Sequence, residues 1–170
     1  AWEAAARELA AELNVKLIGR SRGQKVVLER DWVLEAFELN GRQLKYQQVE
    51  GSFTQPNAGI NRQMLGWACQ QATGLGGNLV ELYCGNGNFT MALAPLFDRV
   101  LATEVSKTSV HAAQYNMAAN GIDNIQLARM SAEEFSAALA GREQFQRLIS
   151  SHLQSWRLVL ELNTTESLLN

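Results

Sequence analysis

Apolar residues recur with several different spacings along the first fifty positions, and each spacing predicts its own kind of element. Residues 2–13 place apolar side chains three and four positions apart, which predicts an amphipathic helix. Two β-like runs follow at 15–19 and 24–29, and the Ser-Arg-Gly sequence between them predicts a hairpin turn. Segment 31–40 is ambiguous, whereas 44–50 predicts a further strand.

The segment 52–57, with the sequence SFTQPN, interrupts this pattern and introduces a second helix. Its proline biases the preceding residue toward extended geometry, and Asn57 can cap the helix that follows. Side chains recur at helical spacing in that helix at Ile60, Met64, Trp67 and either Ala68 or Gln71. We therefore place a domain boundary near residue 51.

From residue 79 onward, short apolar runs alternate with helical segments. The expected strands are 79–83, 99–104 and 124–129, and the expected helices are 89–95, 107–120 and one opened by a capping box at 131–134. Strands that alternate with helices predict a parallel sheet with right-handed crossovers. A fourth strand could lie at 156–162.

These elements predict an α/β chain with two parts. Residues 1–50 would form part of a small α+β domain. Residues 51–170 would form the first half of a Rossmann-like domain, in which 141–170 is a divergent tail because the alternation weakens there.

The turn between the first strand of this domain and its helix carries the strongest chemical signal. Strand, glycine loop and helix form the first unit of a Rossmann-like nucleotide site. The loop holds Gly85 and Gly87, but Thr90 stands where a dinucleotide loop has its third glycine. An acidic residue, Glu81, precedes the two glycines instead. This order is similar to the first motif of S-adenosylmethionine-dependent methyltransferases.

A second signal lies at the end of the next strand. Glu104 follows Gly85 by 19 residues, and a carboxylate about 20 residues after such a loop can accept from both ribose hydroxyls. The glycine loop, the acid Glu81 before it and the carboxylate of Glu104 after it together favour an adenosyl ligand. A plain strand–turn–helix unit without such a ligand stays open as the alternative.

Composition narrows the class of protein. A hydrophobic content of 46% can build a core, and no apolar run reaches the roughly 18 residues of a membrane span. The start of the chain lacks signal-peptide character. The two cysteines, Cys69 and Cys84, cannot form a disulfide framework or a zinc site, so we expect no metal and a reducing cytoplasm.

The net charge of −2 does not indicate a nucleic-acid binder. One cluster on and beside the expected hairpin turn is an exception, with four cations and no acid between them: Lys16, Arg20, Arg22 and Lys25. A solvated hairpin tip and a phosphate-contacting tip are equally good interpretations of this cluster.

Four segments carry recognisable motifs: 52–57 (SFTQPN), 81–89 (ELYCGNGNF), 97–104 (FDRVLATE) and 113–120 (AQYNMAAN). Together they resemble the RNA uracil-C5 methyltransferase family, and most of all its members that act on tRNA. The likeness covers about residues 1–140. It implies a methyltransferase fold, S-adenosylmethionine as cofactor, and an RNA-contacting role for the first domain.

The resemblance also implies cofactor contacts. Gln55 would reach the methionine end, Tyr83 and Asn88 would flank the loop of Gly85 and Gly87, and Glu104 would hold the ribose. Only Gln55 would not have been chosen from the pattern alone.

The family reaction adds a cysteine thiolate to C6 of a flipped-out uracil, after which C5 takes the methyl group and a carboxylate base removes the C5 proton. The Asp-Pro-Pro-Arg segment, the later cysteine and the base of the family have no counterpart here. Cys84 lies in the cofactor loop, where a packing role is expected. We therefore expect an internal fragment, inactive alone and without catalytic residues, whose end could reflect a shifted reading frame.

The expected function of the parent enzyme is S-adenosylmethionine-dependent methylation of C5 of a uridine in the tRNA T-loop, in the cytoplasm, with the T-arm of tRNA as partner. Two alternatives stay open: an enzyme that acts on uracil in rRNA, and a non-catalytic module that binds the cofactor or RNA.

Overall fold

The computed structural model describes residues 2–141 and 156–161. By its internal contacts the chain divides into two units, Ala1–Val33 and Leu34–Asn170, and each is described by itself. The predicted boundary near residue 51 differs from this division and stays a prediction.

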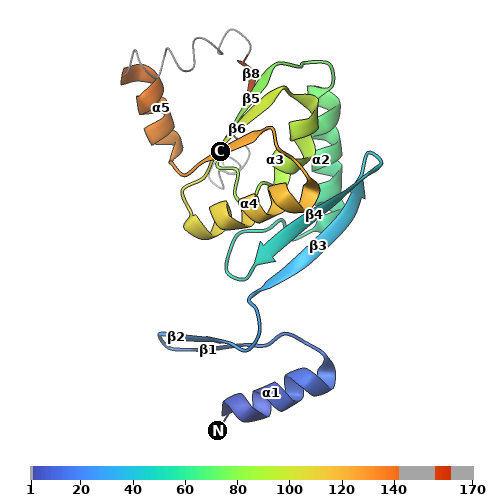
Figure 1. Ribbon diagram of the computed structural model, residues 1–170, viewed down its shortest axis with the longest axis vertical. Coiled ribbons are helices and arrows are strands. Elements are labelled where there is room, and N and C mark those ends of the chain that lie inside the picture. The colour runs from blue at the N-terminus through green and yellow to red at the C-terminus, as the bar shows by residue number, and fades with distance from the viewer. Residues whose placement is uncertain (1, 142–155, 162–170) are drawn as a thin grey trace, which may run out of the picture. The chain divides into compact units, whose positions relative to one another are not determined.

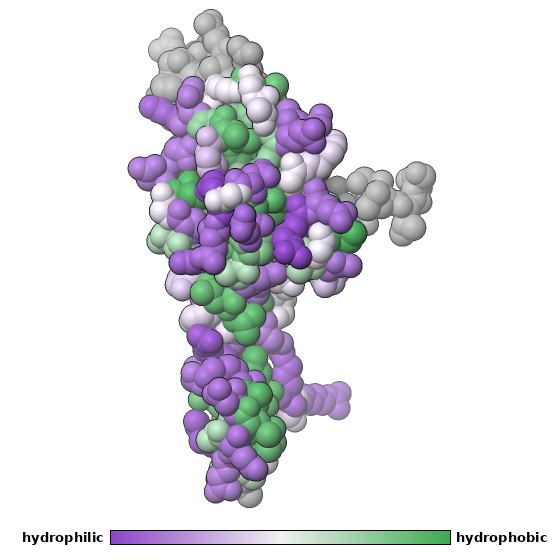
Figure 2. Space-filling view, turned by 90° about the vertical axis from the view of Figure 1, so that its right-hand side faces the viewer, coloured by the Kyte–Doolittle hydropathy of each residue, from purple (hydrophilic) through white to green (hydrophobic). Residues whose placement is uncertain are grey.

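The smaller unit consists of a helix and a hairpin. Helix α1 spans Trp2–Leu13, as predicted, and the antiparallel strands β1 (Ile18–Ser21) and β2 (Gln24–Val27) enclose the expected turn. None of the residues of α1 is buried. The large apolar side chains of this helix, Trp2, Leu9 and Leu13, are exposed, and Figure 2 shows hydrophobic and hydrophilic side chains next to each other on this unit.

A second hairpin opens the larger unit. Strand β3 (Trp32–Leu39) and strand β4 (Arg42–Val49) form a two-stranded sheet. Asn40 and Gly41 join them with φ values of 50° and 77°, which is typical of the type I′ turn that closes two-residue hairpins. The segment that is ambiguous in the sequence is therefore a strand, since β3 gains its partner across this turn.

The main sheet has four parallel strands. They are β5 (Asn78–Leu82), β6 (Arg99–Thr103), β7 (Ile125–Ala128) and β8 (Trp156–Glu161), in the order β7-β6-β5-β8. The helices are α2 (Ala58–Ala72), α3 (Asn88–Leu93) with a 3-10 turn at Ala94–Leu96, α4 (Lys107–Asn120) and α5 (Ala132–Gly141). The α/β fold and its parallel sheet are confirmed, including the strand expected near residue 156.

Helices cover both faces of this sheet (Figure 1). Leu79, Val100 and Ile125 point to the face that carries α2, α3 and α4, where the larger core lies. Val80 and Leu82 point the other way and pack against Ala132 and Phe135 near the start of α5. Because both faces are covered, the strands are continuous apolar runs, as in other buried parallel sheets.

The β3–β4 hairpin contributes to the larger core. Leu44 and Tyr46 of β4 are buried there, and the Tyr46 ring stacks on Phe37 of β3 with 5.5 Å between the ring centroids. Strand β4 also contacts α4. This packing explains why the structure groups residues 34–50 with the nucleotide fold.

Helix α2 buries only part of the stripe that its apolar spacing predicts: Ala68 is buried and Met64 packs partly buried against the larger core. Ile60 and Trp67, two members of the stripe that we identified, are 50% and 62% exposed. The buried positions carry mostly small or polar side chains: Asn61, Leu65, Ala68, Cys69 and Ala72. Small side chains let α2 approach the sheet closely, so size rather than hydrophobicity marks its inner face.

Candidate functional site

The ends of three parallel strands bring the predicted site residues to one edge of the sheet. Beyond β5 and β6 the ladder continues, because the Cys84 N–H donates to the carbonyl of Thr103 at 2.9 Å. The Glu104 N–H donates to the carbonyl of Ala128, at the end of β7, at 3.1 Å. Ligand sites of open α/β sheets lie at this carboxyl edge.

Glu104 contacts the glycine loop directly. The Gly85 N–H donates to Glu104 Oε2 at 3.0 Å, and the Ser106 N–H donates to Glu104 Oε1 at 2.7 Å. The side chain is only 9% exposed. A carboxylate offers about four acceptor positions, so each oxygen keeps a further lone pair for a ligand hydroxyl.

The loop bends through three residues with positive φ: Tyr83 at 57°, Gly85 at 60° and Gly87 at 83°. A Cβ atom on Gly85 would meet nothing within 4 Å, which leaves open space beside the backbone for a ligand. A Cβ atom on Gly87 would lie 2.7 Å from Cε of the buried Met91. The two glycines are therefore needed for different reasons: Gly85 leaves space beside the backbone, and Gly87 lets Met91 of α3 pack closely against the loop.

Tyr83 combines a strained backbone with a side chain that spans to α5. A positive φ is uncommon for a bulky residue and occurs often at functional sites. The Tyr83 hydroxyl donates to Glu133 Oε1 at 3.2 Å. Hydrogen bonds from the Glu133 backbone, Ser131 and Tyr83 lower the pKa of the Glu133 carboxyl, so this acid is a stable acceptor for the tyrosine.

Asn88 begins α3, and its side chain is held by a residue that sequence reasoning missed. The amides of Asn88 and Asn61 exchange two hydrogen bonds of 2.8 and 3.1 Å. The hydroxyl of Tyr46 donates to the Asn88 carbonyl at 3.0 Å. Asn88 thus joins α3 to α2 and to β4. Its amide faces a protein partner, and its contact with the cofactor stays a prediction.

Gln55 lies in the irregular loop before α2 and is half-buried. Asn57 caps that helix as predicted, because its side chain accepts the Ile60 N–H at 3.0 Å. Asn61, in the first turn of α2, then reaches Asn88 beside the glycine loop. The start of α2 is thereby fixed to the loop, and Gln55 stays a predicted contact.

Glu81 is a core residue. It is 1% exposed, and the Thr90 hydroxyl donates to Glu81 Oε2 at 2.6 Å. Burial raises the pKa of Glu81 to about 8, against the opposing effect of the Thr90 hydrogen bond. The acidic lead of the motif is therefore a buried carboxyl group, shifted by burial toward its neutral form, that ties strand β5 to helix α3.

Neither cysteine has the environment of a nucleophile. Cys84 is 1% exposed, and burial together with the charges of Glu81 and Glu104 raises the pKa of its thiol. Burial also raises the pKa of Cys69, on the inner face of α2. A raised pKa keeps a thiol protonated, and the thiolate is the reactive form. Both cysteines are therefore unreactive core residues, as expected for Cys84.

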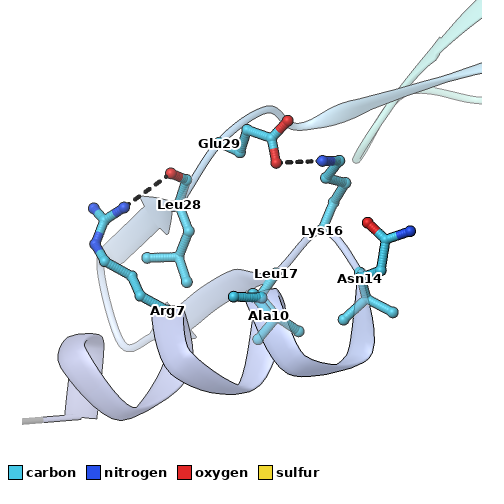
Figure 3. Close-up of a pocket in the computed structure, with 9 residues that line it drawn as sticks. Arg7, Ala10, Asn14, Lys16, Leu17, Leu28 and Glu29 are labelled. Atoms are coloured by element: carbon cyan, nitrogen blue, oxygen red, sulfur yellow. Dashed lines mark hydrogen bonds and ion pairs between the residues drawn. The ribbon is translucent and has the colours of Figure 1, made fainter.

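In the smaller unit, acids pair with Lys16 and Lys25 of the clustered cations. Figure 3 shows a hollow between α1 and the segments 14–17 and 28–29 that flank the β1–β2 hairpin, where Lys16 forms an ion pair with Glu29 and Arg7 donates to the Leu28 carbonyl at 3.2 Å. Lys25 pairs with Asp31 at 2.7 Å. These pairs lower the net charge that the hairpin offers to a phosphate, although Arg22 at the tip is exposed.

Two features are absent from the described residues. None of their helices is both long and apolar enough to cross a membrane. None of their His, Cys, Asp and Glu side chains gather in a group of three or more that could hold a metal ion.

Comparison with known proteins finds relatives whose sequences align with most of this chain. A curated tRNA/tmRNA (uracil-C(5))-methyltransferase from Dechloromonas aromatica is 78% identical over 157 residues, which are 92% of this chain and 43% of the relative. The enzyme of that name from Cellvibrio japonicus is 57% identical over 156 residues, which are 92% of this chain and 43% of the relative. The chain spans less than half the length of these relatives.

Solved structures agree on the fold. The 16S rRNA N2 G1207 methyltransferase RsmC of T. thermophilus, in complex with AdoMet and guanosine, matches with a TM-score of 0.56 at 18% identity over 92% of this chain and 50% of its own. TYW2 of P. horikoshii, in complex with MeSAdo, matches with a TM-score of 0.51 at 18% identity over 76% of this chain and 48% of its own. Both carry the Rossmann-like methyltransferase fold, which is the fold of this chain.

A sequence profile of one family covers nearly the whole chain. The profile described as tRNA (Uracil-5-)-methyltransferase matches residues 1–161, and it extends into the segment that we treated as a divergent tail. Together with relatives of 57–78% identity, this match shows that the chain belongs to the tRNA (uracil-5-)-methyltransferase family.

Proposed function

We propose that this chain forms the S-adenosylmethionine site of an RNA methyltransferase, and that the whole protein methylates C5 of a uridine in the T-arm of tRNA. The observation that carries the proposal is the contact between the Glu104 carboxylate and the Gly85 N–H at 3.0 Å. It joins the acid of the second strand to the glycine loop of the first, at the carboxyl edge where nucleotides bind.

The residues at this edge fit an adenosyl cofactor. Glu104 is held by two backbone N–H groups and keeps acceptor positions for the two ribose hydroxyls. The open space beside Gly85 admits the ligand close to the backbone. Gln55, Tyr83 and Asn88 would complete the site, and the bound cofactor would supply an electrophilic methyl group.

The substrate follows from the names of the relatives, which are tRNA/tmRNA (uracil-C(5))-methyltransferases. Both cysteines of this chain are buried thiols with raised pKa values, so neither suits attack on uracil. We assign the nucleophile and the base to other parts of the whole protein, the RNA contact to the domain at residues 1–50, and the reaction to the cytoplasm.

The experiment has a binding arm and a transfer arm. Calorimetry of this chain with S-adenosylhomocysteine is expected to show one site. Labelled methyl transfer by the full-length parent is expected on a tRNA transcript and not on its T-loop uridine-to-cytidine variant. Absence of binding would contradict the cofactor site, and transfer to an rRNA transcript instead would contradict the tRNA substrate.

Replacing Gly85 by alanine separates binding from stability. The Cβ would enter the open space that we assign to the ligand, so S-adenosylhomocysteine should bind about tenfold more weakly. The positive φ should cost about 1 kcal/mol of unfolding free energy. Gly121→Ala is a matched control, because Gly121 has φ 63° and equally open surroundings at the end of α4.

The control should lose the same stability in thermal melts and keep the affinity of the wild-type chain. Equal affinity for both alanine variants would remove the ligand from the space beside Gly85.

A further inference from the structure

In the part of the chain that the structure describes, strand β4 pairs only with β3, so its other edge has no strand partner there. Backbone N–H and C=O groups on such an edge need other partners when they are partly buried. Here side-chain amides supply them. Asn120 of α4 accepts the Lys45 N–H at 2.9 Å and donates to the Lys45 carbonyl at 2.7 Å.

Two residues further along β4, the same pattern reaches the glycine loop. Asn116 accepts the Gln47 N–H at 2.6 Å. The Asn86 side chain donates to the Gln47 carbonyl at 3.2 Å and to Gln48 Oε1 at 2.9 Å. Asn116 also donates to the Asn86 carbonyl at 2.8 Å. Asn86, Asn116 and Gln47 therefore form a closed circuit of hydrogen bonds.

The circuit fastens the one residue that separates the two loop glycines. Gly85 and Gly87 both have positive φ, and glycines lose more backbone freedom on ordering than any other residue. A loop that is ordered before the ligand arrives does not incur this loss on binding. The buried Asn116, which is 0% exposed, makes the anchor rigid.

We infer that Asn86 and Asn116 are positioning residues, which hold the glycine loop against β4 in the shape that the cofactor site requires. The inference rests on the proposed function for its ligand, and it adds that the contact of the loop with Gln47 and Gln48 of β4 contributes to the affinity of the site. A further bond, from Gln48 Nε2 to Glu35 Oε2 at 2.8 Å, extends the connection to β3.

The test compares two asparagines of the same helix. Asn116→Ala removes the bonds to Gln47 and to the loop, whereas Asn120→Ala removes three bonds that do not touch the loop. Calorimetry with S-adenosylhomocysteine, well below the melting temperature of each variant, should give about tenfold weaker binding for Asn116→Ala, with a less favourable binding entropy. Asn120→Ala should stay within about twofold of the wild-type chain.

Asn86→Ala provides a second variant at a half-buried position, and it should weaken binding like Asn116→Ala even if that variant does not fold. Equal losses in the Asn120→Ala control, or no loss in either loop variant, would overturn the inference.

If the wild-type chain does not bind S-adenosylhomocysteine, the proposed function fails and amide exchange decides the inference. The Gly87 N–H donates to the Cys84 carbonyl at 2.9 Å. It should exchange faster in Asn116→Ala and Asn86→Ala than in Asn120→Ala. Equal exchange rates in all three variants would overturn the positioning role.

Discussion

Glu104→Ala is expected to weaken the binding of S-adenosylhomocysteine to this chain by about a hundredfold or more. The two ribose hydroxyls of the ligand would lose their hydrogen bonds to the carboxylate. Such charge-assisted bonds are about twice as strong as neutral ones. The Gly85 N–H would also lose its acceptor at 3.0 Å, so the loop would be less well ordered for the ligand. Calorimetric titration of both proteins measures the ratio of dissociation constants.

Two further variants sharpen this result. Glu104→Gln keeps an acceptor oxygen but removes the charge, and it should lose affinity by a smaller factor of about ten. Asp98→Ala is a control that removes an exposed acid immediately before the first residue of β6, at the edge of the sheet opposite to Glu104. It should bind S-adenosylhomocysteine as tightly as the wild-type chain does. Wild-type affinity in Glu104→Ala would exclude Glu104 from the site.

The second large effect concerns the buried Glu81. Its pKa is about 8 in the folded chain, whereas an exposed glutamate has an ordinary pKa of 4.5, so the folded state keeps a proton that the unfolded state releases. The free energy of unfolding should therefore be highest below about pH 4.5 as far as this group is concerned, and fall as the pH rises toward 8. The total change is on the order of several kcal/mol.

Glu81→Gln is the variant that isolates this effect, because glutamine is neutral at every pH and can still accept from the Thr90 hydroxyl. Denaturant unfolding of both proteins between about pH 5 and pH 8 gives the difference between their free energies of unfolding. The contributions of other titrating groups largely cancel in this difference. The wild-type chain should lose stability relative to the variant as the pH rises. A constant difference would show that Glu81 does not titrate in this range.

The sequence was informative wherever the structure depends on neighbours along the chain. The apolar run of β5, the glycines of the loop and Glu104 at the end of β6 follow from local spacing. Parallel pairing then brings the ends of β5 and β6 together, so the contact between Gly85 and Glu104 follows from topology. These parts of the fold and of the site could be predicted.

The remaining contacts join residues that are distant in sequence. Asn61 meets Asn88 across 27 positions, Asn116 reaches the Asn86 carbonyl across 30, and Asn120 reaches Lys45 across 75. No local period marks an asparagine as the partner of a strand edge, because the same side chain suits caps, turns and surfaces. For this reason the amides that fix the glycine loop were visible only in the folded chain.

Polarity is an incomplete guide in two places, since segment 31–40 is ambiguous in the sequence and the apolar stripe of α2 is only partly buried. Strand β3 carries the acids Glu35 and Glu38, which weakened its alternation, and it forms because β4 pairs with it across a tight turn. In α2 the large apolar residues Ile60 and Trp67 are exposed, whereas the polar Asn61 is buried and hydrogen-bonded to Asn88. Hydrophobicity alone therefore identifies the inner face of this helix only in part, since Met64 and Ala68 of the predicted stripe do pack against the core.

A crystal structure of this chain with S-adenosylhomocysteine tests the central claim most directly. We expect ribose hydroxyls within hydrogen-bond distance of the Glu104 carboxylate and the body of the ligand beside Gly85. A ligand seated elsewhere, such as the hollow between α1 and the segments 14–17 and 28–29, with the carboxyl edge of the sheet empty, would contradict this claim.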